Sequence, residues 1–144
     1  MSTTVSWKPL HLTGRTWALP STARAARAAR VRITEQLVEW RLPALVDDVV
    51  LVGVELVTNS LRHGAAPVSL TLSRIRGPGG RDGVRIEVRD AGSGFDVAAV
   101  RAGWPRDDKD CGEGGRGLLL TEMVSECWGS RLDTAGHSVW AHLC

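Results

Sequence analysis

Three polar side chains recur at four-residue spacing inside an otherwise apolar stretch of this 144-residue chain. They are Glu55, Asn59 and His63, in the segment DDVVLVGVELVTNSLRHG at residues 47–64. This spacing places all three on one face of a helix. A carboxylate on an apolar helix is costly unless something pairs with it or uses it. Glu55 and Asn59 could also be the solvent-facing edge of an amphipathic helix. For His63 we prefer a cation favoured at the helix C-terminus over a catalytic group.

A second group follows a predicted strand at residues 84–88. Asp90, Gly92 and Gly94 form the sequence DAGSG. Glycines in such a turn allow positive φ and let a ligand approach the backbone closely. A DxGxG turn alone is weak evidence, because many hairpins and calcium loops look similar.

The third group is a glycine-rich run, CGEGGRGL at residues 111–118, which leads into a predicted helix. Free N–H groups and the positive end of a helix dipole make such a loop suitable for binding phosphate. Arg116 adds a forked donor for phosphate oxygens. The run is not a P-loop, since no Gly-Lys-Ser/Thr follows it, and it comes too late in the chain for a Rossmann motif.

The composition limits the class of protein. Hydrophobic residues make up 43% and charged residues 24%, which is typical of one soluble globular domain. The net charge of +2 is too small to indicate nucleic acid. No stretch resembles a signal peptide or a membrane span, so we expect a cytoplasmic protein. Cys111, Cys127 and Cys144 lack the spacing of a metal or redox motif, and we interpret them as free thiols, with Cys127 the candidate for burial.

Hydrophobic periodicity predicts the elements that must position these groups. The long segment 90–117 is typical of a functional or disordered loop. Arg24, Arg27 and Arg30 form a basic stripe on the first helix, more often a solvated face than a partner site. The predicted elements are a strand or hairpin at 10–19, a helix from an N-cap at Ser21 to about Trp40, a turn at 41–44, the helix 47–64 ending at a left-handed Gly64, strands at 68–75 and 84–88, a helix at 117–127 closed by Gly129, and a strand at 138–143.

The three groups in this order are far more specific than any one of them. The chain resembles the GHKL ATPase superfamily over roughly residues 15–143, and most closely the stand-alone branch that includes bacterial anti-sigma factor serine kinases. The segments that carry the resemblance are ELVTNSLRHG, RDAGSGF, GGRGLLL, the Trp128-Gly129 pair and the final GHSVWAHL.

The resemblance implies a Bergerat-type α/β (α+β) two-layer sandwich, with helices on one face of a mixed, mainly antiparallel sheet. Residues 1–14 would be an N-terminal segment that could add a strand. Residues 15–144 would form a single ATP-binding domain with a lid at 97–113.

The resemblance also implies roles for individual residues in binding ATP or ADP with Mg²⁺. Glu55 would be the general base, Asn59 the Mg²⁺ ligand and Asp90 the acceptor for the adenine amino group. Relatives often carry Gly-Thr-Thr-Val near the end of the chain. Here the sequence is Gly136-His137-Ser138-Val139, so a hydroxyl remains only at Ser138. The remaining nucleotide-binding residues would be His63, Gly92, Gly94, Gly115, Arg116, Gly117, Leu118 and Ser138.

Two functions fit these expectations. The first is a homodimeric switch protein that binds a sigma factor and phosphorylates a serine of a STAS-type antagonist, with no direct contact to nucleic acid or membrane. The second is a non-catalytic ATP-binding regulator that controls a partner by binding only. The presence of Glu55 favours the first, because a protein that only binds needs no base. A sensor histidine kinase fits poorly, since only some fifty residues precede the ATP-site helix.

Overall fold

The computed structural model describes residues 8–94, 102 and 113–144, with the backbone alone for 8–13 and 113–117. The strands of these residues form one sheet in the order β1-β2-β3-β5-β4, in which each pairing is antiparallel. The elements are β1 (Lys8–Leu19), α1 (Arg24–Glu39), η1 (Pro43–Leu45), α2 (Val46–His63), β2 (Val68–Arg76), η2 (Pro78–Gly80), β3 (Asp82–Asp90), α4 (Glu113–Val124), β4 (Cys127–Asp133) and β5 (Gly136–Leu143).

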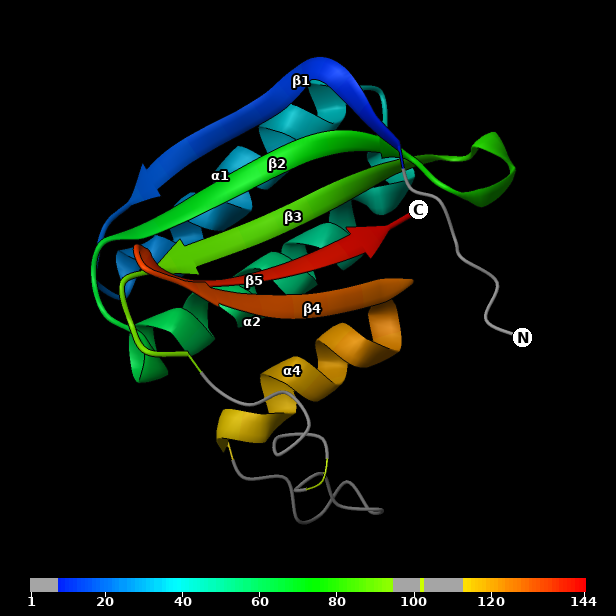
Figure 1. Cartoon of the computed structure of the whole chain (residues 1–144). Helices are drawn as coiled ribbons and strands as arrows, with labels where there is room; N and C mark the ends of the chain where they lie inside the picture. Colours follow the sequence, from blue (N-terminus) through cyan, green and yellow to red (C-terminus); the bar gives the residue numbers. More distant parts are fainter. Residues whose placement is uncertain (1–7, 95–101, 103–112) are drawn as a thin grey trace.

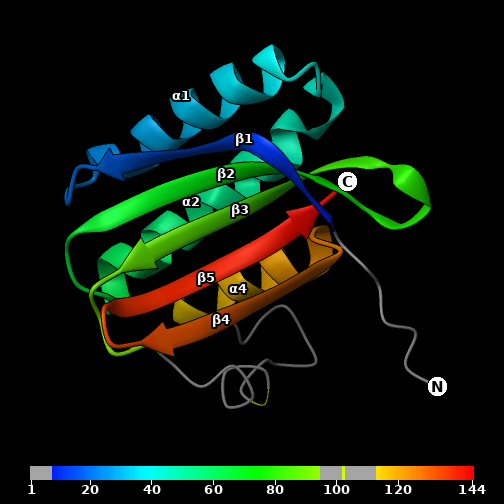
Figure 2. The ribbon, with the colours of Figure 1, turned by 45° about the horizontal axis from the view of Figure 1, so that its top comes forward.

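The helices α1, α2 and α4 lie side by side on one face of the sheet (Figure 1). Seen from a second direction, the opposite face carries no helix of the described chain (Figure 2). The predicted two-layer α+β sandwich is therefore confirmed. We call the two sides of the sheet the helix-facing face and the outer face.

Strand alternation divides the residues between these two faces. In β3, Val84, Ile86 and Val88 are fully buried under the helices. In β5, Val139, Ala141 and Leu143 are also buried under the helices. The helix-facing side chains of both strands therefore belong to the core. The residues between them in each strand lie on the outer face.

Helix α2 is the central element of the helical layer. It packs against α1 on one side and α4 on the other, and it also contacts β3. Its buried residues are mostly β-branched or leucine, which is the wide apolar surface expected of a helix enclosed by other elements. They are Val49, Val50, Val52, Gly53, Leu56, Val57 and Ser60.

Two predicted helix ends are wrong in detail. Helix α1 begins at Arg24 rather than after Ser21, and the Thr22 hydroxyl accepts a hydrogen bond from the Arg24 N–H at 3.3 Å. Gly64 follows α2 in an extended conformation with φ of −99°, not in the left-handed region. A Cβ at Gly64 would lie 2.4–2.6 Å from the Asp90 carboxyl atoms, so close contact and not φ requires a glycine here.

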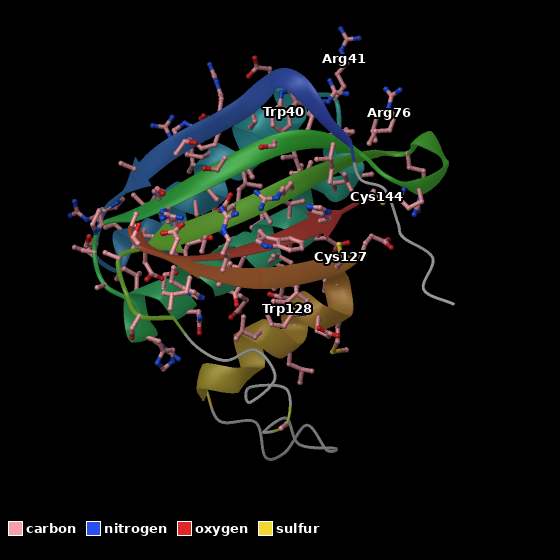
Figure 3. All side chains as sticks on the ribbon, in the orientation of Figure 1. Trp40, Arg41, Arg76, Cys127, Trp128 and Cys144 are labelled. Atoms are coloured by element: carbon pink, nitrogen blue, oxygen red, sulfur yellow. The ribbon has the colours of Figure 1, made fainter. Side chains whose placement is uncertain are left out.

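The predicted helix at 117–127 is also shifted. The structure has α4 at Glu113–Val124, followed by the strand β4, which the sequence did not reveal. Gly129 does not close a helix but lies within β4, where a Cβ would come within 2.7 Å of the Trp140 ring. The indole Nε1–H of Trp128 donates a hydrogen bond to the Glu122 carboxylate, which holds α4 against β4 (Figure 3).

Three further expectations concern the periphery. Residues 8–14 continue into β1, so the expected boundary at residue 14 falls inside this strand. Arg24, Arg27 and Arg30 are all exposed, and they border two different surface grooves rather than one. Cys127 and Cys144 are free thiols at the same end of the sheet (Figure 3), and Cys127 is partly buried. Cys111 lies outside the described residues. So does the expected lid at 97–113, except for residues 102 and 113.

Candidate functional site

Asp90 is the last residue of β3 and continues the helix-facing series of Val84, Ile86 and Val88. It therefore directs a carboxylate into a face that is otherwise apolar, and it is only 4% exposed. The backbone N–H of Gly92 donates a hydrogen bond to Asp90 Oδ1 at 2.7 Å. This bond fixes the carboxylate and satisfies one of its two oxygens.

Backbone crowds the Asp90 carboxylate on two further sides. Gly64, just after α2, packs directly against the carboxyl atoms. The Ala91 N–H donates to the Ala65 carbonyl at 2.8 Å, which ties the segment after α2 to the end of β3. Gly136 has a φ of +143°, and a Cβ there would lie 2.1 Å from the Asp90 carbonyl oxygen. Side chains larger than hydrogen at Gly64 and Gly136 would therefore displace Asp90.

Helix α2 brings polar side chains to the same place. Asn59 and His63 line a small cavity together with Asp90, Gly64, Gly94 and His137. Asn59 is half-buried and His63 is exposed. Glu55 lies one turn before Asn59 on the same face of α2 and is half-buried, but it does not line this cavity. Of the three polar residues on the predicted helix face, Asn59 and His63 therefore line the cavity and Glu55 lies outside it.

His137 is the residue of this cavity that the sequence did not assign to the site. It pairs with Asp90 across β3 and β5, so both side chains lie on the helix-facing face, and it is only 3% exposed. Burial lowers the pKa of His137 below its usual value, while the nearby Asp90 carboxylate acts in the opposite direction. The alternation of His137 with Val139, Ala141 and Leu143 is the sequence signal that could have placed His137 on the helix-facing face. Its position opposite Asp90 also requires the register with β3.

Ser138 is not brought into the cavity. It neighbours His137 in β5, so it points to the outer face, where it pairs with Arg89 of β3 and Arg131 of β4. Its hydroxyl is buried among these strands and makes no hydrogen bond within the described residues. The prediction that Ser138 contacts the nucleotide depended on the residue type, and strand alternation places that side chain on the opposite side of the sheet.

Residues 113–118 of the glycine-rich run lie inside α4 rather than in a loop before it. Gly115, Arg116 and Gly117 belong to the first turns of the helix, which begins at Glu113. The free N–H groups of the first turn therefore include those of Glu113, Gly114 and Gly115. Leu118 is 2% exposed and packs into the core, so its side chain is structural. The side chain of Arg116 lies outside the described part of the chain.

The described residues contain no group of three or more His, Cys, Asp or Glu side chains that could hold a metal ion by themselves. Nor is any helix among them long and apolar enough to cross a membrane. What the site offers is a fixed carboxylate, one amide and two imidazoles around a single cavity. That set can bind a ligand carrying hydrogen-bond donors, and it could share a cation with the ligand.

Comparison with known proteins identifies the family. The family model described as "histidine kinase-like ATPase domain" matches residues 19–142, which is most of the chain. The comparison with curated proteins gives no match. The match runs from the end of β1 to the end of β5 and so includes every element that borders the cavity. The chain therefore belongs to the histidine kinase-like ATPases of the GHKL superfamily.

Proposed function

We propose that the protein binds ATP with Mg²⁺ and transfers the γ-phosphoryl group to a serine of a STAS-type partner, as part of a switch in which it also binds a sigma factor. The observation that best supports nucleotide binding is the buried Asp90 carboxylate, held by Gly92 and facing the same cavity as Asn59. We further propose that the protein acts in the cytoplasm as a homodimer.

Asp90 suits recognition of an adenine amino group. Oδ1 already accepts the Gly92 N–H, which leaves Oδ2 for an outside donor. A buried acceptor with this fixed orientation discriminates against a base that lacks the amino donor, because the acceptor would then lose its partner.

The residues also fit a magnesium ion that is shared with a nucleotide. Mg²⁺ usually keeps several waters and takes only one or two protein ligands beside substrate phosphates. The Asn59 amide oxygen can be such a ligand. The ion would neutralise phosphate charge during transfer, and the first-turn N–H groups of α4 could contact phosphate oxygens.

Glu55 is the proposed general base. It lies one turn before Asn59 on the same face of α2 and is half-buried, so part of it is accessible to an incoming hydroxyl. During transfer the serine oxygen forms a bond to the γ-phosphorus, the bond to the bridging oxygen breaks, and ADP leaves. Glu55 accepts the serine proton or orients the hydroxyl for attack.

The test separates transfer from binding. Glu55→Gln keeps the size of the side chain but removes the base, and Glu55→Ala removes the side chain. Both should lower phosphoryl transfer to a STAS protein by about 10²- to 10⁴-fold while nucleotide affinity changes only a few-fold. Asn59→Ala should reduce both, because Asn59 would hold the Mg²⁺ that supplies positive charge to the phosphates. The measurements are transfer of labelled phosphate, nucleotide titration and sigma-factor pull-down for each variant.

The wild-type protein decides between this function and its alternative. If Mg-ATP with candidate STAS proteins yields no phosphoserine by mass spectrometry, while ATP still controls partner binding, the kinase assignment is wrong and the protein is a non-catalytic regulator. If no nucleotide binds at all, both assignments are wrong.

A further inference from the structure

The cavity beside Asp90 is very small. The space that Asn59, His63, Gly64, Asp90, Gly94 and His137 enclose has a volume of about 10 Å³. That volume is close to the minimum that holds one water molecule. By comparison, an apolar cavity of about 150 Å³ is needed to hold benzene, and a purine is larger than benzene. A base could lie inside this space only if the space became more than tenfold larger.

The wall that moves is limited by packing. Asp90 and His137 have their backbones paired across two central strands, and Gly64 is in contact with the Asp90 carboxylate. Gly64 and Gly94 have no side chain to rotate. His63 is exposed and Asn59 is half-buried, so both are less enclosed than His137. Among the described residues that border the cavity, His137 has the one large buried side chain.

His137 fills the volume between Asp90 and the chain at Gly94. A Cβ built on Gly94 would lie 2.7 Å from His137 Cδ2, so the ring packs directly on the backbone there. Rotation about its χ angles would carry the ring away from Asp90 without shifting the strand. Burial favours the neutral imidazole here, while the charge of the Asp90 carboxylate acts in the opposite direction.

We propose that His137 is a steric gate of the base pocket: its imidazole occupies the space beside Asp90 that the base of a nucleotide takes, and it turns away when the nucleotide binds. The proposal deepens the proposed ATP-binding function and depends on it. It assigns to His137 a part in controlling how readily the pocket opens.

The gate makes a quantitative prediction. When only the open state binds, the apparent affinity is reduced by the fraction of molecules that are open. A smaller side chain at position 137 leaves the pocket permanently open. With an open fraction of about 10%, His137→Thr and His137→Ser should each bind roughly tenfold more tightly than the wild type, with a faster association rate.

The experiment is stopped-flow and equilibrium titration with ATP labelled on the ribose by a methylanthraniloyl group. The matched control is His142→Thr, the same substitution five residues along β5, whose side chain lies on the outer face. It should leave the association rate and the affinity unchanged. Adding Asp90→Ala to His137→Thr should cancel the gain, which places the binding at this cavity. Thermal unfolding of each variant confirms that it is folded.

The outcomes distinguish the gate from the function on which it rests. Faster, tighter binding by both small variants supports the gate, and so does binding by His137→Thr when the wild type binds too weakly to measure. Weaker binding would overturn the gate and make His137 a contact for the base. Unchanged binding would also overturn it, because the pocket would open elsewhere. Absence of nucleotide binding by the wild type and both small variants would overturn the gate together with the ATP-binding function.

Discussion

Polar side chains have different surroundings on the two faces of the sheet, although alternate residues of the same strands form both faces. On the helix-facing face, β3 and β5 are apolar until their paired ends, where Asp90 and His137 meet. On the outer face, the charged groups of β3 pair along and across the strands. Arg85 bonds Glu87 at 2.7 Å and lies 5.4 Å from the Trp140 ring, and Arg89 bonds Asp133 at 2.5 Å.

The comparison teaches how much a polar residue means in each place. A charged side chain on the outer face finds partners among its neighbours, so its presence needs no ligand to explain it. A carboxylate at the end of an apolar row is expensive to bury and is held there by specific contacts. The polar residues that interrupt the core are therefore the strongest candidates for a functional role.

The strongest way to break this comparison is to remove one side chain from each face. Ile86→Ala on the helix-facing side of β3 should cost about 2–5 kcal/mol of unfolding free energy, because it leaves a cavity in the core. Thr71→Ala on the outer face removes a hydrogen bond to Thr16 and should cost about 1 kcal/mol or less. Urea unfolding measures both. Equal losses would mean that the outer face is itself covered, as in a dimer.

A second test uses pH and His142, whose side chain lies on the outer face. Burial lowers the pKa of His142 to about 4, and the neighbouring Arg85 acts in the same direction. Above the unfolded value of 6.5 the residue is neutral in both states and contributes nothing. As the pH falls below 6.5, the unfolded state binds a proton that the folded state does not yet bind. Stability then falls progressively as the pH approaches the folded-state pKa of about 4.

The measurement is the difference in unfolding free energy between the wild type and His142→Gln. At pH 7.5 this difference reflects packing alone. At pH 4.5 it should shift in favour of the variant, which has no proton to bind. A difference that stays constant with pH would show that the ring is accessible to solvent.

The third test compares neighbouring faces at the site. Asp90→Ala should weaken adenine nucleotide binding by about 1–3 kcal/mol, because the amino group of the base loses its acceptor. Ser138→Ala, on the other side of the same sheet, should change affinity less than twofold. Calorimetry on both folded variants decides this. An unchanged affinity in the Asp90 variant would mean that the base is read elsewhere, and a loss in the Ser138 variant would contradict the division between faces.

Much of the fold could be predicted from the sequence, because α2, β2 and β3 have strong local signals. The strip of apolar residues between Val49 and Leu61 and the alternation of VRIEV are properties of short segments. Strand β4 could not be predicted in the same way. Its sequence CWGSRLD alternates weakly, and it becomes a strand through pairing with β5.

The candidate site was predictable where one segment carried the signal and obscure where two had to be combined. Asp90 stands out next to its own strand and glycines. His137 belongs to the site only because the β3–β5 register places it opposite Asp90, and no single segment contains that register. Ser138, which the sequence analysis assigned to the site, is the next residue along the strand, and its side chain therefore lies on the other face. The sequence indicated that a glycine is needed at position 64, but for the wrong reason. The reason is its close contact with Asp90 and not a left-handed φ.

The hydrogen bond between Trp128 and Glu122 also gives the protein an optical reporter. The chain has six tryptophans and no tyrosine, so its near-ultraviolet emission comes almost entirely from indole groups. The Trp128 ring lies between β4 and α4, so its emission depends on how closely the Glu122 carboxylate approaches it. Subtracting the spectrum of Trp128→Phe from that of the wild type therefore isolates a signal for the separation of α4 from the sheet, without any added dye.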